Sequence, residues 1–297
     1  MSVRALQLDR SGGIDALTLR EVPAPTPKPG QILVRTVAST INPLDRKTRR
    51  KPHVPFPITL GCDVGGVVVE SDAADFRPGD RVIALTFPLD HGVGAWSDLV
   101  ALDPQQIAHA PATVSLSDAA TIPLAGLTGL QAWDVVDLPP GERVLVTGAA
   151  GAIGGYVVQL ASHAGMKVDG LVSRSSHVRP VNGLGAGFVT SDPGELPPHA
   201  YAAIVDPIGA PAKGVDVREF VAEGGQYVAV GSDESQIPGG REVSVDDDPA
   251  GLARLVTLVD DGALELRVAA HYGLHEFRAA HEYFESGGLF GKVVLHL

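Results

Sequence analysis

Arg143-Val-Leu-Val-Thr-Gly-Ala-Ala-Gly-Ala-Ile-Gly-Gly-Tyr156 is the stretch that decides the fold of this chain of 297 residues. Residues 144–147 have high β propensity and run directly into a glycine-rich turn, which a helical apolar pattern follows. A strand, a tight turn and a helix in this order open a dinucleotide-binding βαβ unit. Gly148 permits the sharp exit from the strand, Gly151 lets a pyrophosphate approach the backbone, and Gly154 lets the helix pack closely on the sheet.

The glycine spacing is Gly-x-x-Gly-x-x-Gly rather than the commoner Gly-x-Gly-x-x-Gly, so a βα turn without a ligand is also compatible with it. If a dinucleotide binds, the unpaired N–H groups at the helix N-terminus face its phosphates. The cofactor contacts predicted in this turn are Gly148, Ala149, Ala150, Gly151, Ala152, Ile153 and Gly154.

The kind of dinucleotide is indicated about twenty residues further on, where the apolar segment 167–172 predicts the next parallel strand. In NAD-binding units this strand ends near a carboxylate that binds the ribose hydroxyl. Here the strand ends in Ser173-Arg174-Ser175-Ser176, and Asp169 lies inside it. A guanidinium and hydroxyls suit a 2′-phosphate, which favours NADP(H), with Ser173 and Arg174 as contacts. The same residues would also suit a solvated polar loop.

Strands and helices alternate after Glu142, which predicts an α/β fold with a doubly wound parallel sheet. The predicted strands are 143–147, 167–172, 187–190, 202–206, 226–230 and 242–246. Because such sheets bind ligands at the carboxyl ends of their strands, Asp206, Gly231 and Ser232 are further predicted cofactor contacts.

The first 110 residues or so have mostly strand-like patterns, in short segments separated by proline- and glycine-rich turns. Short, frequent strands of this kind predict a small barrel or sandwich. The predicted strands of this part are 31–38, 63–70, 81–87 and 97–102, and a helix from about 275 to 285 precedes a last strand over 292–297.

Composition limits the partners. The net charge of −12 and a single basic cluster, Arg46 to Lys51, argue against nucleic acid as the main partner. One cysteine excludes an intramolecular disulfide and a cysteine-rich zinc site. No apolar run has the length of a signal-peptide core or a membrane span, so we expect a cytoplasmic protein with no membrane partner.

Five blocks in order resemble the zinc-free quinone oxidoreductase branch of the medium-chain dehydrogenase/reductase superfamily. The blocks are Ala38–Asp45 (with Asn42-Pro-Leu-Asp45), Leu60–Glu70, Phe76–Val82, Ala119–Ala132 and Ala280–Leu295. The resemblance covers essentially the whole chain.

This resemblance implies a Rossmann sheet inserted into a chaperonin-10-like β-rich catalytic domain. The implied boundaries are 1–116 for the catalytic domain, 117–262 for the NADP-binding domain, and 263–297 for a segment that completes the catalytic domain. It also implies a homodimer. By the same resemblance, Asn42 and Thr128 lie near the nicotinamide, and Gly291 and Lys292 belong to the cofactor site.

Zinc-containing members of the superfamily hold a catalytic zinc with a Cys, a His-Glu pair and a further Cys. At the corresponding positions this sequence has Asn42, Cys62-Asp63 and Leu124, which do not form a tetrahedral site. We therefore predict no metal, and substrates that accept hydride without a Lewis acid, namely quinones and α,β-unsaturated carbonyls.

The predicted catalytic residues are Asn42, Lys47 and Asp45. Asn42 would donate toward the developing oxyanion, and Lys47 would assist electrostatically unless it is a solvated turn lysine. Asp45 either orders its turn or acts as a base, with the first favoured.

Other side chains offer weaker candidates. Cys62 is expected to be a small buried side chain, and His281 a packed histidine on the last helix. His91 and Trp96 would line the substrate cleft or belong to an ordinary loop.

The sequence thus predicts an NADPH-dependent reductase of quinones or α,β-unsaturated carbonyls that works by direct hydride transfer. Two alternatives stay open: a reductase of 2-enoyl thioesters or other alkenes, and a non-catalytic NADPH-binding sensor protein.

Overall fold

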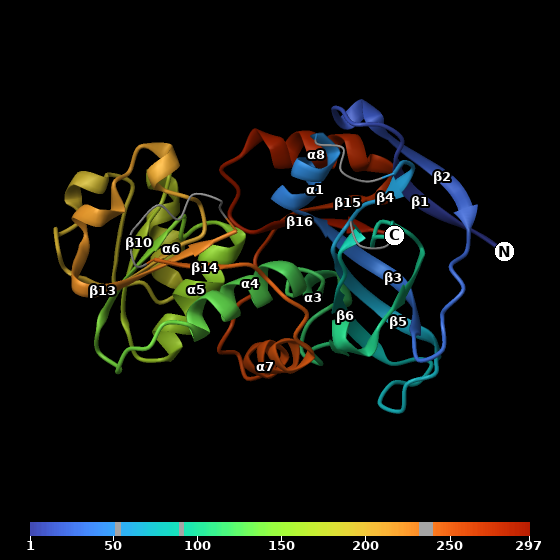
Figure 1. Cartoon of the computed structure of the whole chain (residues 1–297), viewed down its shortest axis with the longest axis horizontal. Coiled ribbons are helices and arrows are strands. Elements are labelled where there is room, and N and C mark those ends of the chain that lie inside the picture. The colour runs from blue at the N-terminus through green and yellow to red at the C-terminus, as the bar shows by residue number, and fades with distance from the viewer. Residues whose placement is uncertain (51–54, 89–91, 232–239) are drawn as a thin grey trace.

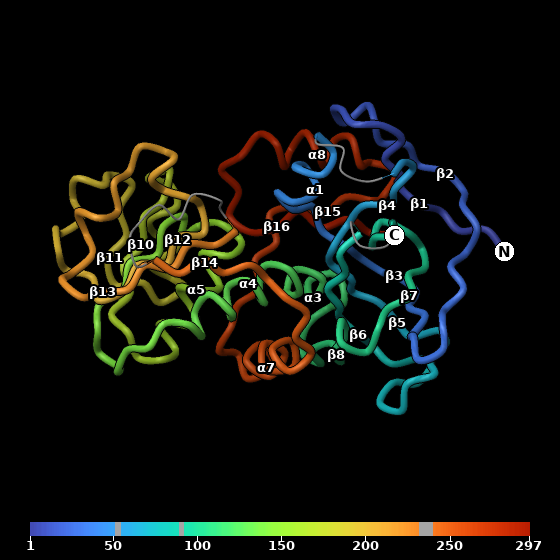
Figure 2. The backbone as a smooth tube through the Cα atoms, in the orientation of Figure 1, coloured from blue at the N-terminus to red at the C-terminus, as the bar shows by residue number. Residues whose placement is uncertain are grey.

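The computed structural model describes residues 1–50, 55–88, 92–231 and 240–297. Two units lie side by side, and helix α4 (Pro123–Asp134) runs between them (Figure 1). One unit is built on a parallel sheet and the other on an antiparallel sheet. Figure 2 shows that the two ends of the chain belong to the same, antiparallel unit. The structure therefore confirms the predicted combination of a doubly wound sheet with a β-rich domain.

The parallel unit contains a sheet of six strands, all paired in parallel. In sheet order they are β11 (Phe188–Thr190), β10 (Lys167–Leu171), β9 (Arg143–Thr147), β12 (Tyr201–Asp206), β13 (Val221–Val230) and β14 (Arg241–Val243). Helix α5 (Ala152–His163) links β9 to β10, and α6 (Val178–Gly183) links β10 to β11. Strand order reverses beside β9, which is where open sheets of this kind bind ligands.

The antiparallel unit contains a sheet of seven strands and a smaller sheet of three. The larger sheet consists of β15 (Val268–Gly273), β16 (Lys292–His296), β3 (Ile32–Ile41), β5 (Asp63–Ser71), β6 (Arg81–Leu85), β8 (Ile107–His109) and β7 (Leu99–Leu102), which pairs with β3. The smaller sheet consists of β2 (Leu17–Pro23), β1 (Ser2–Leu8) and β4 (Ile58–Thr59).

Two C-terminal strands complete the larger sheet. β16 pairs antiparallel with the end of β3, and β15 pairs in parallel with β16. Helix α8 (Phe277–Ser286) joins the two strands and lies over them beside the N-terminal segments (Figure 1). The parallel unit is thus inserted between the first and last segments of the antiparallel unit.

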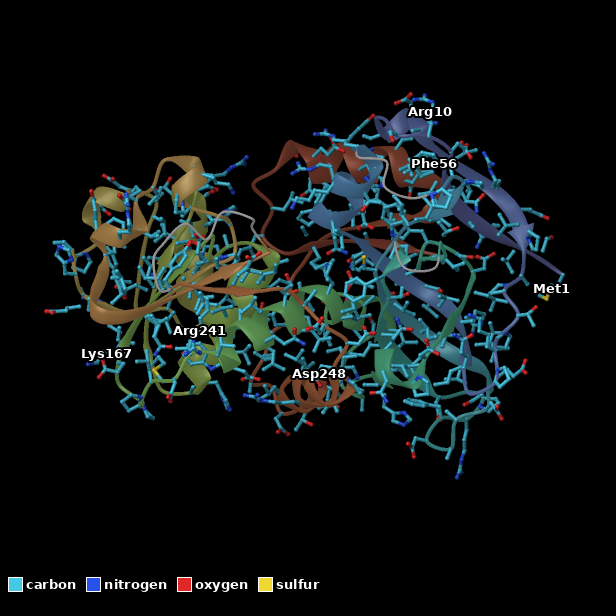
Figure 3. All side chains as sticks on the ribbon, in the orientation of Figure 1. Met1, Arg10, Phe56, Lys167, Arg241 and Asp248 are labelled. Atoms are coloured by element: carbon cyan, nitrogen blue, oxygen red, sulfur yellow. The ribbon has the colours of Figure 1, made fainter. Side chains whose placement is uncertain are left out.

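Helix α4 joins the two units through its packing. It is buried along nearly its whole length, so it is apolar on all sides, as expected for a helix covered on every face. One apolar cluster extends from Leu85 in β6 through Leu127 in α4 to Val157 in α5. The short helix α3 (Leu116–Ala119) precedes α4. Helix α7 (Pro249–Asp260) packs against α4 and lies below it in Figure 1. Asp248, labelled in Figure 3, caps α7 by accepting a hydrogen bond from the Gly251 N–H.

Residues 43–50 form helix α1 (Pro43–Arg50), so the alternative of a solvated turn at Lys47 is wrong. Pro43 stands at the first helical position, where its missing N–H costs nothing. Arg49 is 1% exposed and pairs with Glu285 of α8, so a buried cation holds this helix against the C-terminal segment. Lys51 lies outside the described residues. No helix in the described parts of the chain is long and apolar enough to cross a bilayer.

Candidate active site and dinucleotide cleft

The glycine-rich turn after β9 has the backbone that the sequence predicts. Gly148 adopts φ +57°, and a Cβ there would lie 2.3 Å from Cγ2 of Ile208. A Cβ on Gly154 would lie 2.3 Å from the Gly148 carbonyl oxygen, so the first turn of α5 approaches the strand exit more closely than any side chain would allow. Both positions require glycine. The turn therefore fits a pyrophosphate on its N–H side.

A cavity of about 370 Å³ opens beside this turn at the carboxyl ends of the parallel strands. Four of the predicted cofactor residues line it, and three of them belong to the turn: Gly148, Ala150 and Gly151. Ser173, at the end of the next strand, also lines it. The predicted pyrophosphate turn and the predicted 2′-phosphate contact thus line the same cavity.

Arg174 is exposed and lies at the edge of this cavity. A Cβ on Gly288, a wall residue, would lie 1.9 Å from the guanidinium carbon of Arg174. Arg174 has no ion pair with any residue that the structure describes, so its guanidinium is available to a ligand. Exposed Lys213 lines the same cavity and was missed by the sequence analysis, because no motif marks it.

Asp206, predicted as a cofactor contact, is fully buried and ties strand ends together. Its carboxylate accepts hydrogen bonds from the hydroxyls of Thr147 and Tyr227 and from the Ala210 N–H. Burial, with the hydrogen bond to Asp206, raises the pKa of Tyr227. Gly231 follows β13 at φ +56°, and Ser232 lies outside the described residues. Contact of these three with a cofactor stays a prediction.

A buried polar network lies where the antiparallel unit meets helix α4. Asp63 of β5 is 0% exposed and accepts hydrogen bonds from the Thr40 hydroxyl, from Asn42 Nδ2 at 2.8 Å and from Lys292 Nζ at 2.8 Å. Its other oxygen accepts from the Leu124 N–H at 2.7 Å, in the first turn of α4. Four donors therefore satisfy one carboxylate, as a buried charge requires.

Lys292 is the cation of this network. Its ammonium lies between Asp63 and Asn42, 2.5 Å from Asn42 Oδ1, and the residue is 5% exposed. Both ends of the Asn42 amide are thus engaged: Oδ1 accepts from Lys292 and Nδ2 donates to Asp63. Thr128, predicted near the nicotinamide, is buried one turn along α4 and donates to the Leu124 carbonyl.

These donors do not fit a zinc ion. At the positions where zinc-containing members hold their ligands, the chain has the Asn42 amide, buried Cys62, Asp63 and an apolar Leu124. A lysine ammonium already contacts two of them. Among the residues that the structure describes, no group of three or more His, Cys, Asp or Glu side chains is placed to bind a metal. The absence of a bound metal in the protein itself stays a prediction.

Asp45 lies in the wall of a second cavity, of about 340 Å³, with Thr48, Cys62 and Phe87. Val245 and Asp246, which follow β14 of the other unit, also line it, so this cavity lies between the two units.

Asp45 also orders its turn, as predicted. Its carboxylate accepts from the Asn42 N–H at 2.8 Å and from the Gly61 N–H at 3.1 Å. Burial raises its pKa to about 7, with a smaller contribution from the nearby charge of Asp63.

Lys47 is exposed on α1 and is not part of the cavity wall. Of the two alternatives for Trp96, the structure favours the loop residue: it is fully buried, donates its indole N–H to the Thr40 carbonyl and does not line this cavity. His281 is 1% exposed and packs edge-on against Trp96, which confirms the packed histidine. Cys62 is fully buried, as expected, and His91 lies outside the described residues.

Two protein-family models match the chain. The alcohol dehydrogenase GroES-like domain matches residues 28–112, and a model described as zinc-binding dehydrogenase matches residues 188–295. Together they cover more than half of the chain: the first lies in the antiparallel unit, and the second runs from β11 of the parallel unit into β16 of the antiparallel unit.

Curated relatives and solved structures agree with these matches. The chain is 29% identical to the 2-methylene-furan-3-one reductase of Solanum lycopersicum, over 96% of this chain and 76% of that protein. It is also 29% identical to the chloroplastic NADPH-dependent alkenal/one oxidoreductase of Arabidopsis thaliana, over 96% and 77%. The quinone oxidoreductase structure from Coxiella burnetii superposes with a TM-score of 0.88 at 26% identity, with both chains fully covered. The chain therefore belongs to the quinone oxidoreductase branch of the medium-chain dehydrogenase/reductase superfamily.

Proposed function

We propose that this protein is an NADPH-dependent reductase of quinones or α,β-unsaturated carbonyls that transfers hydride directly and uses no metal. The observation that supports this most is the buried Lys292 ammonium between Asn42 and Asp63, beside the cavity that contains Asp45. An organic cation occupies the place where related enzymes use zinc. The names of the two plant relatives and of the bacterial quinone oxidoreductase agree with this class of substrate.

NADPH would supply the hydride, and the chain would bind and orient it. The N–H groups of the turn at 148–154 would bind the pyrophosphate, because they face an anion at a helix N-terminus. Ser173 and Arg174 would bind the 2′-phosphate through charge-assisted hydrogen bonds. Lys213, across the same cavity, would add a second cation for the phosphates. These residues fit the dinucleotide that the sequence predicts.

At the substrate end, Asn42 would stabilise the oxygen on which negative charge develops, through the Nδ2 hydrogen that here makes only a long, 3.4 Å contact with the Thr40 hydroxyl. Lys292 holds the Asn42 amide in one orientation by its hydrogen bond to Oδ1, and thus acts through Asn42. Reduction of an activated C=C bond also needs a proton at carbon. The Asp45 carboxyl, which lines the cavity and holds its proton up to about neutral pH, is placed to provide one.

The test is a screen of NADPH oxidation against quinones, enones and 2-enoyl thioesters. Turnover of quinones or enones supports the proposal, whereas fastest turnover of the thioesters would favour the alkene reductase alternative. Tight NADPH binding with no turnover of any substrate in the panel would indicate a binding or sensor protein.

A second test concerns the metal. We expect elemental analysis of the purified protein to show no stoichiometric zinc, and chelators to leave activity unchanged, because the donor set around Asn42 and Asp63 does not suit zinc. Stoichiometric zinc that is lost together with activity would contradict the proposal.

We also propose a homodimer formed through the edge of the parallel sheet. In the described part of the chain, β14 pairs with β13 alone, so it offers an edge to a second copy. Light scattering on the eluted protein gives the mass that decides this. The cytoplasmic location stays a prediction from the sequence.

A further inference from the structure

Arg267 is a buried cation that the proposed reaction does not use. It directly precedes β15, in the segment that returns the chain to the antiparallel unit. Its guanidinium reaches back to the glycine-rich turn of the other unit and donates to three carbonyl oxygens there. The distances are 3.0 Å to Ala150, 2.9 Å to Gly151 and 3.0 Å to Ala152.

This cation has no carboxylate partner among the residues that the structure describes, and it is 7% exposed. The guanidinium stacks over the ring of Phe290 with 5.0 Å between the guanidinium carbon and the ring centroid. Burial lowers its pKa to about 10, while Tyr156 and exposed Glu265 act in the opposite direction. Arg267 is therefore charged at neutral pH, and its charge is not neutralised by an ion pair.

The three carbonyls matter because of the peptide groups to which they belong. In a trans peptide the C=O and the following N–H point in opposite directions. The carbonyls bound by Arg267 share their peptides with the N–H groups of Gly151, Ala152 and Ile153, which therefore point away from the guanidinium. The Gly151 N–H donates to the Gly148 carbonyl at 2.8 Å. The other two belong to the first turn of α5, where an N–H has no acceptor within the helix.

We propose that Arg267 is a positioning residue for the cofactor: it holds these peptide groups by their carbonyl oxygens, so that the N–H groups of Ala152 and Ile153 are aimed at the dinucleotide pyrophosphate. Its unpaired charge also polarises the same peptides and adds a favourable field for an anion. This inference rests on the proposed cofactor and adds to it. The segment that completes the catalytic unit would thereby control the phosphate turn of the other unit.

Gly155 supports this assignment independently. A Cβ at this position would lie 2.0 Å from Nη2 of Arg267 and 2.1 Å from its Cζ. Glycine inside a helix is unfavourable relative to alanine, so its presence needs a reason. The space that Gly155 leaves is the space that the guanidinium fills.

The test compares NADPH with adenosine 2′-monophosphate, which lacks the pyrophosphate, by titration calorimetry on the full chain. We expect Arg267→Met to weaken NADPH binding by about 10- to 100-fold, since it removes charge-assisted hydrogen bonds. Binding of adenosine 2′-monophosphate should change by less than about twofold. Arg267→Lys should be intermediate, because an ammonium retains the charge but not the planar fork.

A second variant, Gly155→Ala, keeps the charge of Arg267 and displaces its guanidinium from the turn. Gly155→Ala places a methyl group on the guanidinium and improves helix propensity, so the fold should be retained. We expect NADPH binding to weaken by about tenfold. Two matched controls should bind NADPH like the parent: Arg254→Met, which removes an exposed cation paired with Asp134, and Gly183→Ala, where a Cβ meets nothing within 4 Å.

Parent-like NADPH affinity in Gly155→Ala and in folded Arg267→Met would overturn the inference. Equal weakening of both ligands would also overturn it, because a general structural role moves both. If Arg267→Met does not fold, the NADPH affinity of Gly155→Ala alone tests the inference. A parent that binds NADPH but reduces nothing would refute the proposed reaction alone, and a parent that does not bind NADPH would refute the cofactor and this inference together.

Discussion

Lys292 and Arg267 are both nearly buried cations of the C-terminal segment, at 5% and 7% exposure, yet their surroundings differ. Lys292 has a carboxylate, Asp63, at 2.8 Å, whereas Arg267 contacts carbonyl oxygens. A buried ion pair is locally neutral and its removal leaves a stranded charge. Carbonyl groups are neutral, so a cation that they bind keeps its net positive charge and can attract an incoming anion. The Lys292–Asp63 ion pair therefore suits a structural role beside the proposed catalytic cavity. The carbonyl-bound Arg267 suits a phosphate site.

The largest expected effect follows from breaking the ion pair. Lys292→Met should reduce the free energy of unfolding by about 3–5 kcal/mol in urea titrations, because Asp63 would remain buried without its cation. Adding Asp63→Asn should restore part of the loss. Arg267→Met should cost less, since it strands no carboxylate.

Lys28→Met provides the matched control, because Lys28 is exposed and its removal should stay within about 0.5 kcal/mol. A loss below about 1 kcal/mol in Lys292→Met would show that Asp63 does not depend on its ammonium, and the contrast between the two cations would disappear.

The next prediction concerns Asp45, a buried carboxyl that, unlike Asp63, has no cation within hydrogen-bond distance among the described residues. Its carboxyl has a pKa of about 7 against 3.8, chiefly because of burial, so the folded state holds a proton that the unfolded chain releases. Stability is therefore highest below about pH 4 for this group and falls as the pH rises to about 7, by at most about 4 kcal/mol. Asp45→Asn should remove this slope from unfolding free energies measured across that range. Parallel curves for the two proteins would mean that Asp45 is ionised in the folded state.

Turnover gives the third comparison. Asn42→Ala should lower kcat by about 10²–10³ on the best substrate of the screen, because it removes the side chain proposed to donate to the oxygen on which charge develops. NADPH should still bind, since the glycine turn that would hold its pyrophosphate is untouched. Lys47→Ala serves as a control and should cost no more than about tenfold, because this side chain is exposed on α1. Full turnover in Asn42→Ala would assign oxyanion stabilisation to another donor.

The smallest expected effect concerns an exposed cation. Arg174→Ala should remove most of a roughly 10–150-fold preference for NADPH over NADH in kcat/KM, the range that one charge-assisted contact provides. NADH use should be nearly unchanged. Equal kcat/KM for the two cofactors in the parent would refute the assignment of Arg174 to the 2′-phosphate.

Much of the fold could be predicted because it depends on local patterns. The strand–turn–helix at 143–156 is specified by adjacent residues, and the structure confirms β9 and α5 there. In the basic segment, the alternative of a solvated turn at Lys47 was wrong. Pro43 and the burial of Arg49 against Glu285 made it helical instead. That contact joins residues 236 apart in sequence, which no local pattern records.

The site was predicted in pieces. Asn42 and Lys292 were both named from motifs, but the sequence could not show that they share a hydrogen bond, because they are 250 residues apart. Their contact depends on the register of β16 against β3. Arg267 was missed altogether. The available signal was Gly155, a second glycine inside the helix that phosphate binding does not require.

The pairing of β3 with β16 has a consequence for how the chain is made. The parallel sheet is assembled from residues between Arg143 and Val243, so it can form while synthesis continues. The pairing of β3 with β16 can form only after about 250 further residues have been made, and closing so long a loop is slow. During that interval the Ala38–Ile41 edge is open and Asp63 lacks its counter-ion. We expect the nascent chain to be most prone to aggregation and most dependent on chaperones at this stage, with the early-made half of the catalytic unit maturing last.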